Sequence, residues 1–256
     1  MFSGRIPADL APNRLTLAAA HARRDGRAVV DLTLSNPTLA DIDYPSDLLA
    51  PLAEARGLTY RPLPLGAPAA RTAVAADYAR HGTSIQPDQI ALTSSTSEAY
   101  SILFKVLCDP GDEVLVPRPS YPLFDHLTRL DGVVPVPYTL DYHGHWSVDL
   151  ASVEQGLSER SRAILLVSPN NPTGSYVSAD ELDELARLAA ARGAAIIGDE
   201  VFADYELAPG VRVASGRLLE NRGALCFSLG GLSKSIGLPQ AKLAWIGVSG
   251  PRAQVD

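Results

Sequence analysis

The sequence has 256 residues, with 22 lysines and arginines against 29 aspartates and glutamates, and a formal net charge of −7. Proteins that bind nucleic acid or anionic membranes usually carry a basic excess, so this balance argues against both partners. Hydrophobic residues make up 46% and charged residues 20%, which is typical of a globular protein and excludes a disordered one.

The first part of the chain is predicted to be an arm with separate helical segments. Alanine and leucine at helical spacing predict a helix from Pro7 to Arg24. An extended segment is expected from Val29 to Leu34, and further helices over residues 47–56 and 67–80. Residues 60–66, rich in proline, form an irregular loop between these two helices.

After Pro87, strand and helix patterns alternate. Apolar runs predict seven strands, at residues 90–93, 114–116, 133–138, 163–167, 194–197, 224–227 and 242–248. Helices are expected between them at residues 97–107 and 121–130, and from the cap Ser178 to Arg192. This alternation favours an α/β fold with a mostly parallel, seven-stranded sheet sandwiched by helices.

Four of these strands run directly into polar residues. The polar segments are Ser94-Ser95-Thr96-Ser97, Ser168-Pro169-Asn170-Asn171, Asp199-Glu200 and Ser228 to Lys234. Ligands of open α/β sheets bind beyond the carboxyl ends of the strands, so we expect the four segments to form one site. Each segment alone is typical of an ordinary cap or turn.

Lysine is rare in this chain, which contains Lys105, Lys234 and Lys242 and otherwise uses arginine. Lysine can lose its proton and act as a nucleophile, whereas arginine cannot. Lys105, late in a predicted helix, is explained by chance or by the helix dipole. Lys234 and Lys242 share one glycine-rich stretch and are candidates for chemistry.

A soluble, cytoplasmic protein is expected. No apolar run approaches the roughly 18 residues of a membrane span, and the N-terminus lacks the apolar core of a signal peptide. Cys108 and Cys226 are too few for a disulfide framework. No metal site is expected.

In order along the chain, four motifs resemble those of the class I/II aminotransferases, pyridoxal-phosphate enzymes of fold type I. These motifs are Ser95-Thr96-Ser97-Glu98-Ala99, Asn171-Pro172-Thr173-Gly174, Asp199-Glu200-Val201-Phe202-Ala203-Asp204-Tyr205 and Ser233-Lys234. The segments Asp109 to Val114 and Pro119 to Pro122 match in place. The resemblance covers nearly the whole chain and implies the large, cofactor-binding domain of that fold.

The resemblance implies a role for each site residue. Lys234 would hold pyridoxal phosphate as a Schiff base and move a proton during the reaction. Asp199 would pair with the pyridine nitrogen, Asn171 would bond the ring hydroxyl, and Tyr121 would lie against the ring face. The phosphate would sit near Ser95, Thr96 and Ser97 at a helix N-terminus, where Lys242 would neutralise it. Ser233 would be a further cofactor-binding residue.

A homodimer is also implied, because Tyr60 resembles the tyrosine that reaches the phosphate of the neighbouring subunit. The alternative is a purely structural role, in which Tyr60 packs within its own proline-rich loop. Three positions depart from the family pattern, and at one of them Gly231 replaces a serine that would donate to the phosphate. Lys242 replaces an arginine and cannot make the bidentate contact with phosphate that a guanidinium makes. Phe202 replaces a tyrosine whose hydroxyl would face the ring.

The expected domains are an N-terminal arm and start of a small domain at residues 1–45, and the cofactor-binding domain at residues 46–256. The rest of the small domain, with the arginine that clamps the substrate carboxylate, is expected beyond residue 256. The implied reaction is transfer of an amino group from an amino acid to a 2-oxo acid. A lyase or decarboxylase of the same fold, or a weakly active cofactor-binding fragment, stays open.

Two other readings are disfavoured by the residues themselves. A phosphate-binding loop near Lys234 lacks the glycine that should precede the lysine, because Ser233 stands there. A transcription regulator would need an added basic DNA-binding segment, and none is found.

Overall fold

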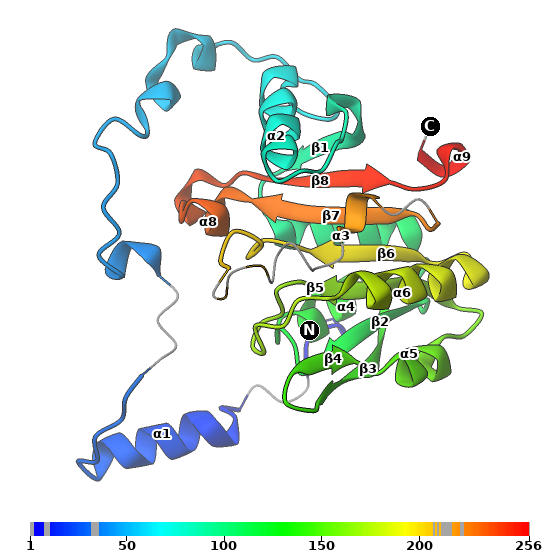
Figure 1. The fold of residues 1–256 in the computed structure, drawn as a ribbon. Coiled ribbons are helices and arrows are strands. Elements are labelled where there is room, and N and C mark those ends of the chain that lie inside the picture. The colour runs from blue at the N-terminus through cyan, green and yellow to red at the C-terminus, as the bar shows by residue number, and fades with distance from the viewer. Residues whose placement is uncertain are drawn as a thin grey trace. The chain divides into compact units, whose positions relative to one another are not determined.

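A computed structural model describes residues 3–7, 11–31, 36–206, 208, 210, 217–220 and 223–255. Its contacts define two compact units, residues 1–60 and 61–256 (Figure 1). This division lies later in the chain than the boundary expected between residues 45 and 46, and the two functional domains stay a prediction. Among the described helices, none combines the length and hydropathy that crossing a lipid bilayer requires.

The described residues of the first unit form one α-helix, and none of them is buried. Helix α1 spans Arg14–Arg24 and starts later than predicted, because the Asn13 side chain caps it by accepting from the Thr16 N–H at 2.8 Å. The helix predicted at residues 47–56 is wrong. Two 3₁₀ turns, Ala50–Ala53 and Ala55–Leu58, form instead, since Pro51 and the lack of a buried face disfavour a longer α-helix.

Another expectation for this unit, the extended segment from Val29 to Leu34, is tested in part. Residues 29–31 form no strand, and residues 32–35 lie outside the described residues. A third 3₁₀ turn spans Pro37–Leu39.

One sheet of eight strands organises the second unit, in the order β1-β8-β7-β6-β5-β2-β3-β4. The strands are Ile90–Thr93 (β1), Glu113–Arg118 (β2), Val134–Tyr142 (β3), Trp146–Val148 (β4), Ser161–Val167 (β5), Ala195–Asp199 (β6), Cys226–Gly231 (β7) and Ala244–Ser249 (β8). β2, β3, β5, β6 and β7 are parallel, β8 is antiparallel to both neighbours, and β4 is antiparallel to β3. The seven predicted strands are confirmed, and β4 was not predicted.

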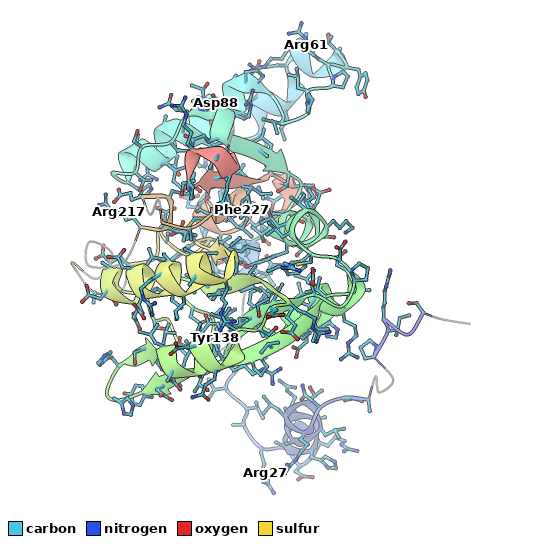
Figure 2. All side chains as sticks on the ribbon, turned by 90° about the vertical axis from the view of Figure 1, so that its right-hand side faces the viewer. Arg27, Arg61, Asp88, Tyr138, Arg217 and Phe227 are labelled. Atoms are coloured by element: carbon cyan, nitrogen blue, oxygen red, sulfur yellow. The ribbon has the colours of Figure 1, made fainter. Side chains whose placement is uncertain are left out.

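Helices cover both faces of this sheet (Figures 1 and 2). They are Pro68–Arg80 (α2), Thr96–Leu107 (α3), Phe124–Leu130 (α4), Leu150–Gly156 (α5) and Ala179–Arg192 (α6). Two short helices, Leu232–Ser235 (α8) and Arg252–Val255 (α9), follow β7 and β8 at the ends of those strands. α5 and α6 pack on one face with Ile164 and Ile196, while α3 and α4 pack on the other with Leu165 and Ile197. Adjacent residues of β5 and β6 are thus buried on opposite faces, which explains their unbroken apolar runs.

Helix α6 begins at a capping box. Ser178 Oγ accepts from the Glu181 N–H at 3.3 Å, and Glu181 Oε2 accepts from the Ser178 N–H at 2.8 Å. We expect Ser178→Ala to lower the free energy of unfolding by about 1 kcal/mol, because the first turn loses an acceptor. Urea unfolding measures the change. Ser178→Thr, which keeps the hydroxyl, is the control, and an equal loss in both variants would contradict the capping role.

Candidate active site

The carboxyl ends of β1, β5, β6 and β7 lie at one edge of the sheet. β5, β6 and β7 are consecutive and parallel. β1 and β7 flank β8, and both Thr93 and Gly231 pair with Ala244. The polar residues that follow the four strands therefore lie along one edge, as the sequence predicts.

Helix α3 starts at this edge with unpaired backbone N–H groups. Ser95 is the N-cap, and its Oγ accepts from the Glu98 N–H at 3.1 Å. Within the described part of the chain, no acceptor pairs with the N–H groups of Thr96 and Ser97. Such groups at a positive helix end can hold an anion.

Lys242 lies close to the start of α3, in a left-handed backbone conformation (φ 52°) ahead of β8. The pKa of Glu98 is lowered, chiefly by the hydrogen bond that its carboxylate accepts from the Ser94 N–H at 2.6 Å, and to a lesser extent by the positive charge of Lys242. The structure thus brings a cation and the free N–H groups of α3 to the same place.

Asp199, the last residue of β6, is a buried carboxylate with 7% exposure. Its Oδ2 accepts from the Tyr100 hydroxyl at 3.0 Å, and its Oδ1 accepts from the Val201 N–H at 3.2 Å. Burial raises the pKa of Asp199 to about 6, while these two hydrogen bonds and the charge of Lys234 act in the opposite direction. Burial thus disfavours the ionised carboxylate, and a cationic partner that binds next to it would stabilise the ionised form.

Lys234 lies on the short helix α8, directly after β7. Its ammonium nitrogen is 5.5 Å from the centre of the Phe202 ring, and its charge lowers the pKa of Asp199. The Tyr205 hydroxyl donates to the Lys234 carbonyl at 2.7 Å, which ties α8 to the segment that follows β6. The amine, the carboxylate and the Phe202 ring are thus brought together.

Other predicted site residues lie at this edge with fewer contacts. Tyr121 is 41% exposed, and its ring meets Phe124 edge-on at 6.0 Å. Asn171 is exposed, and Ser233 is half-buried beside Lys234. Tyr60 belongs to the first compact unit.

Sequence reasoning missed Asn170, the buried neighbour of Asn171. Asn170 accepts from Ser120 Oγ at 3.1 Å and donates to the Pro119 carbonyl at 3.1 Å. It thereby holds the turn after β5 against the segment that carries Tyr121. Nothing in the sequence distinguishes the inward from the outward member of an Asn-Asn pair.

Tyr100 was also missed. It is 2% exposed on the inner face of α3. A tyrosine at a helical core position needs a partner for its hydroxyl, and that requirement is the signal that could have singled it out.

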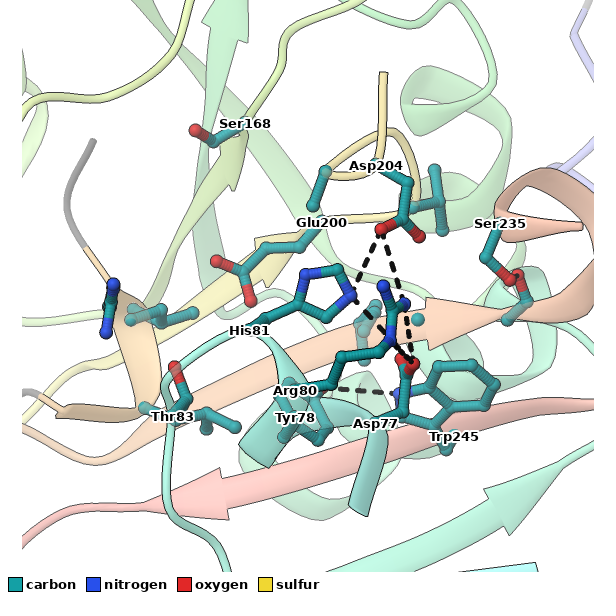
Figure 3. A pocket seen from close by; sticks show the side chains of 18 of the residues that line it. Asp77, Tyr78, Arg80, His81, Thr83, Ser168, Glu200, Asp204, Ser235 and Trp245 are labelled. Atoms are coloured by element: carbon teal, nitrogen blue, oxygen red, sulfur yellow. Dashed lines mark hydrogen bonds and ion pairs between the residues drawn. The ribbon is translucent and has the colours of Figure 1, made fainter. Parts of the chain in front are cut away.

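A cavity of about 470 Å³ lies next to the site, and no predicted site residue lines it (Figure 3). Glu200 points to the face opposite Asp199, where its carboxylate accepts from Ser228 Oγ. Ser228 Oγ in turn lies 2.9 Å from the Tyr78 hydroxyl of α2. His81 and Asp204, on the cavity wall, form an ion pair at 3.1 Å when the histidine is protonated. These contacts anchor the segment that carries Phe202 to α2.

The chain is similar to known aminotransferases in sequence. The family model "Aminotransferase class I and II" matches residues 36–253. The alanine aminotransferase of Mycobacterium tuberculosis is 29% identical over 242 residues, which cover 91% of this chain and 55% of that protein. The aspartate/prephenate aminotransferase of Thermus thermophilus is 33% identical over 204 residues, or 78% of this chain and 52% of that protein.

Solved structures give the same result. An alanine aminotransferase from Pyrococcus furiosus superposes with a TM-score of 0.77 at 28% identity, covering 93% of this chain and 62% of that one. A double mutant of the Thermus thermophilus aspartate aminotransferase gives a TM-score of 0.77 at 29% identity, covering 100% of this chain and 66% of that one. The chain spans about half the length of the curated relatives it matches. Its motifs, sheet and matched residues show that it belongs to the class I and II aminotransferase family.

Proposed function

We propose that this chain is the cofactor-binding part of a pyridoxal-phosphate-dependent aminotransferase, which transfers an amino group from an amino acid to a 2-oxo acid. The observation that carries the proposal is the amine of Lys234, which lies 5.5 Å from the centre of the Phe202 ring and lowers the pKa of the buried Asp199 carboxyl group by its charge. Membership of a family of pyridoxal-phosphate enzymes supports it.

The donor set fits the chemical groups of this cofactor. The phosphate requires an anion site, which the free N–H groups of Thr96 and Ser97 and the charge of Lys242 would supply. The protonated ring nitrogen requires a negative partner, and the Asp199 carboxylate is buried at that edge. The aldehyde requires a primary amine, and Lys234 provides one.

When bound, pyridoxal phosphate supplies an electron-withdrawing ring that stabilises negative charge on the substrate carbon. Lys234 Nζ would hold the cofactor through its aldehyde and, as a free amine, would accept the proton from the substrate α-carbon. Asp199 would keep the ring nitrogen protonated. Tyr121 would pack against the ring face, and Asn171 would donate to the ring hydroxyl. Phe202 contributes an apolar contact, because it has no hydroxyl to donate.

The proposal includes a homodimer in which Tyr60 reaches the phosphate bound by the neighbouring subunit. Tyr60 is 89% exposed, which leaves its hydroxyl available to a second copy. The two domains at residues 1–45 and 46–256, and a cytoplasmic location, belong to the same proposal. Sedimentation analysis with and without the cofactor tests the dimer, and a monomer under both conditions would contradict it.

Borohydride reduction tests the attachment site. The protein is incubated with pyridoxal phosphate, reduced and digested, and the labelled peptide is identified by mass spectrometry. We expect the label on Lys234 alone among the three lysines. A label on Lys105 or Lys242 with none on Lys234 would overturn the assignment.

Product analysis tests the reaction. A transaminase consumes more than one equivalent of amino donor per cofactor only when a 2-oxo acid is added, whereas a lyase or decarboxylase turns over without one. We expect turnover that depends on the 2-oxo acid. Turnover that is independent of it would favour the lyase or decarboxylase.

The role of Lys242 is testable with two ligands that differ by one phosphate. We expect Lys242→Gln to weaken binding of pyridoxal phosphate about tenfold and to leave binding of pyridoxal unchanged, because the charge acts on the phosphate. Fluorescence titration measures both affinities. Lys105→Gln, with a side chain that is 63% exposed, is the control. An equal loss for both ligands would place Lys242 away from the phosphate.

A further inference from the structure

Tyr100 makes the one side-chain hydrogen bond to Asp199 that the structure records among the described residues. The Tyr100 hydroxyl donates to Asp199 Oδ2 at 3.0 Å, and both side chains are buried, at 2% and 7% exposure. The other carboxylate oxygen accepts from a backbone N–H, that of Val201. The side chain of Asp199 is therefore held from α3 and from its own segment.

An aromatic cluster fixes the ring of Tyr100. Its centre lies 5.2 Å from that of Phe124 at 78° and 6.0 Å from that of Phe104. Phe124 in turn meets Tyr121 edge-on. Close packing of this kind leaves the hydroxyl little freedom to turn away from Asp199.

Tyr100 also links two parts of the site. It follows Thr96 and Ser97 by about one turn of α3, so the helix that offers the free N–H groups also carries the hydroxyl that binds Asp199. A shift of α3 would move both contacts together.

We propose that Tyr100 is a positioning residue, which holds the Asp199 carboxylate in place for the ring nitrogen of the cofactor. This inference rests on the proposed function for the identity of the cofactor, while the contact between Tyr100 and Asp199 does not depend on it. Tyr100 acts through Asp199 and makes no contact with the reacting atoms.

The hydrogen bond also favours the ionised form of Asp199. Burial raises the pKa of the carboxyl group, and the Tyr100 hydroxyl and the charge of Lys234 lower it. These two side chains, from α3 and α8, are the titratable groups that act on it. Burial, and then the charge of Asp199, hold the pKa of Tyr100 well above its usual range, so the hydroxyl stays a donor at working pH.

The test uses Tyr100→Phe, which removes one oxygen atom. In protein labelled with ¹³C at the aspartate carboxyls, without cofactor, NMR follows the titration of Asp199, and the Asp199→Asn variant assigns its signal. We expect Tyr100→Phe to move this titration upward by about one to two pH units. With pyridoxal phosphate added, we expect at least about tenfold weaker binding and a lower kcat with little change in KM.

Tyr138→Phe is the matched control. Tyr138 is another buried tyrosine, 2% exposed, and its hydroxyl donates to the Leu165 carbonyl at 2.8 Å (Figure 2). Tyr138→Phe also removes a buried hydroxyl oxygen, but this hydroxyl makes no contact with Asp199. An unchanged titration in Tyr100→Phe, or an equal shift in Tyr138→Phe, would overturn the inference.

A second measurement uses the unaltered protein, should Tyr100→Phe fail to fold. The ¹³Cζ chemical shift of Tyr100 is expected to change with pH at the same midpoint as the titration of Asp199. A chemical shift that stays constant over this pH range would contradict the inference. Failure of the proposed function is seen separately, as a native protein that does not bind pyridoxal phosphate although the titrations of Tyr100 and Asp199 are coupled.

Discussion

Lys234→Arg is expected to abolish covalent attachment of pyridoxal phosphate and to lower kcat/KM of transamination on the order of 10³-fold or more. The guanidinium keeps a positive charge near Asp199 and the Phe202 ring, where the Lys234 ammonium lies 5.5 Å from the ring centre. It cannot become a neutral amine, so it neither attaches an aldehyde nor accepts a proton from carbon. Borohydride labelling and steady-state kinetics measure the two losses.

The other two lysines are the controls for this variant. Lys105 lies near the end of α3, where its ammonium contacts the Asp131 carboxylate and donates to the Ser101 carbonyl at 3.3 Å. Lys105→Arg should keep full labelling and activity. Lys242→Arg keeps the charge near the start of α3 and should keep the label. A labelled Lys234→Arg protein would show that the cofactor is attached elsewhere.

The core of the fold was predictable because the signals that specify it are local. The unbroken apolar run at residues 163–167 and the cap at Ser178 involve neighbours in sequence, and β5 and α6 form there. The shared edge of the polar segments follows from parallel strands joined by helices. Residues 47–56 have helical spacing as well, but they are mostly exposed and lack the packing that stabilises a helix of this length.

Contacts between distant residues were not predictable. Tyr100 and Asp199 are 99 positions apart, and Tyr78 and Ser228 are 150 apart. A sequence shows that a buried tyrosine needs a partner, but the partner is set by which strand end the helix meets in the folded sheet. The same reason explains why the half-buried network of Glu200, Ser228 and Tyr78, on the face opposite Asp199, has no signature in the sequence.

Asp199→Asn is expected to stabilise the cofactor-free protein while it removes activity. The pKa of Asp199 rises from 3.8 to about 6, chiefly through burial, which corresponds to a loss of roughly 3 kcal/mol in the free energy of unfolding above pH 6. Asparagine avoids this cost, yet it cannot balance the charge of a protonated ring nitrogen. We therefore expect a gain of about 1–3 kcal/mol at pH 8, with kcat lowered at least about 10²-fold.

The gain should depend on pH with a defined sign. Below about pH 4 the carboxyl group is protonated in both the folded and the unfolded chain, so it carries no ionisation penalty. Between about pH 4 and 6 the unfolded chain releases its proton first, and the native protein loses stability as the pH rises, whereas Asp199→Asn does not. Urea unfolding of both proteins at pH 5 and pH 8 measures the difference. Asp125→Asn, at an exposed position of α4, is the control. If the two proteins differ in free energy of unfolding by the same amount at both pH values, ionisation of Asp199 does not destabilise the cofactor-free protein. That result would contradict a site in which the Asp199 carboxylate lacks a cationic partner until the cofactor binds.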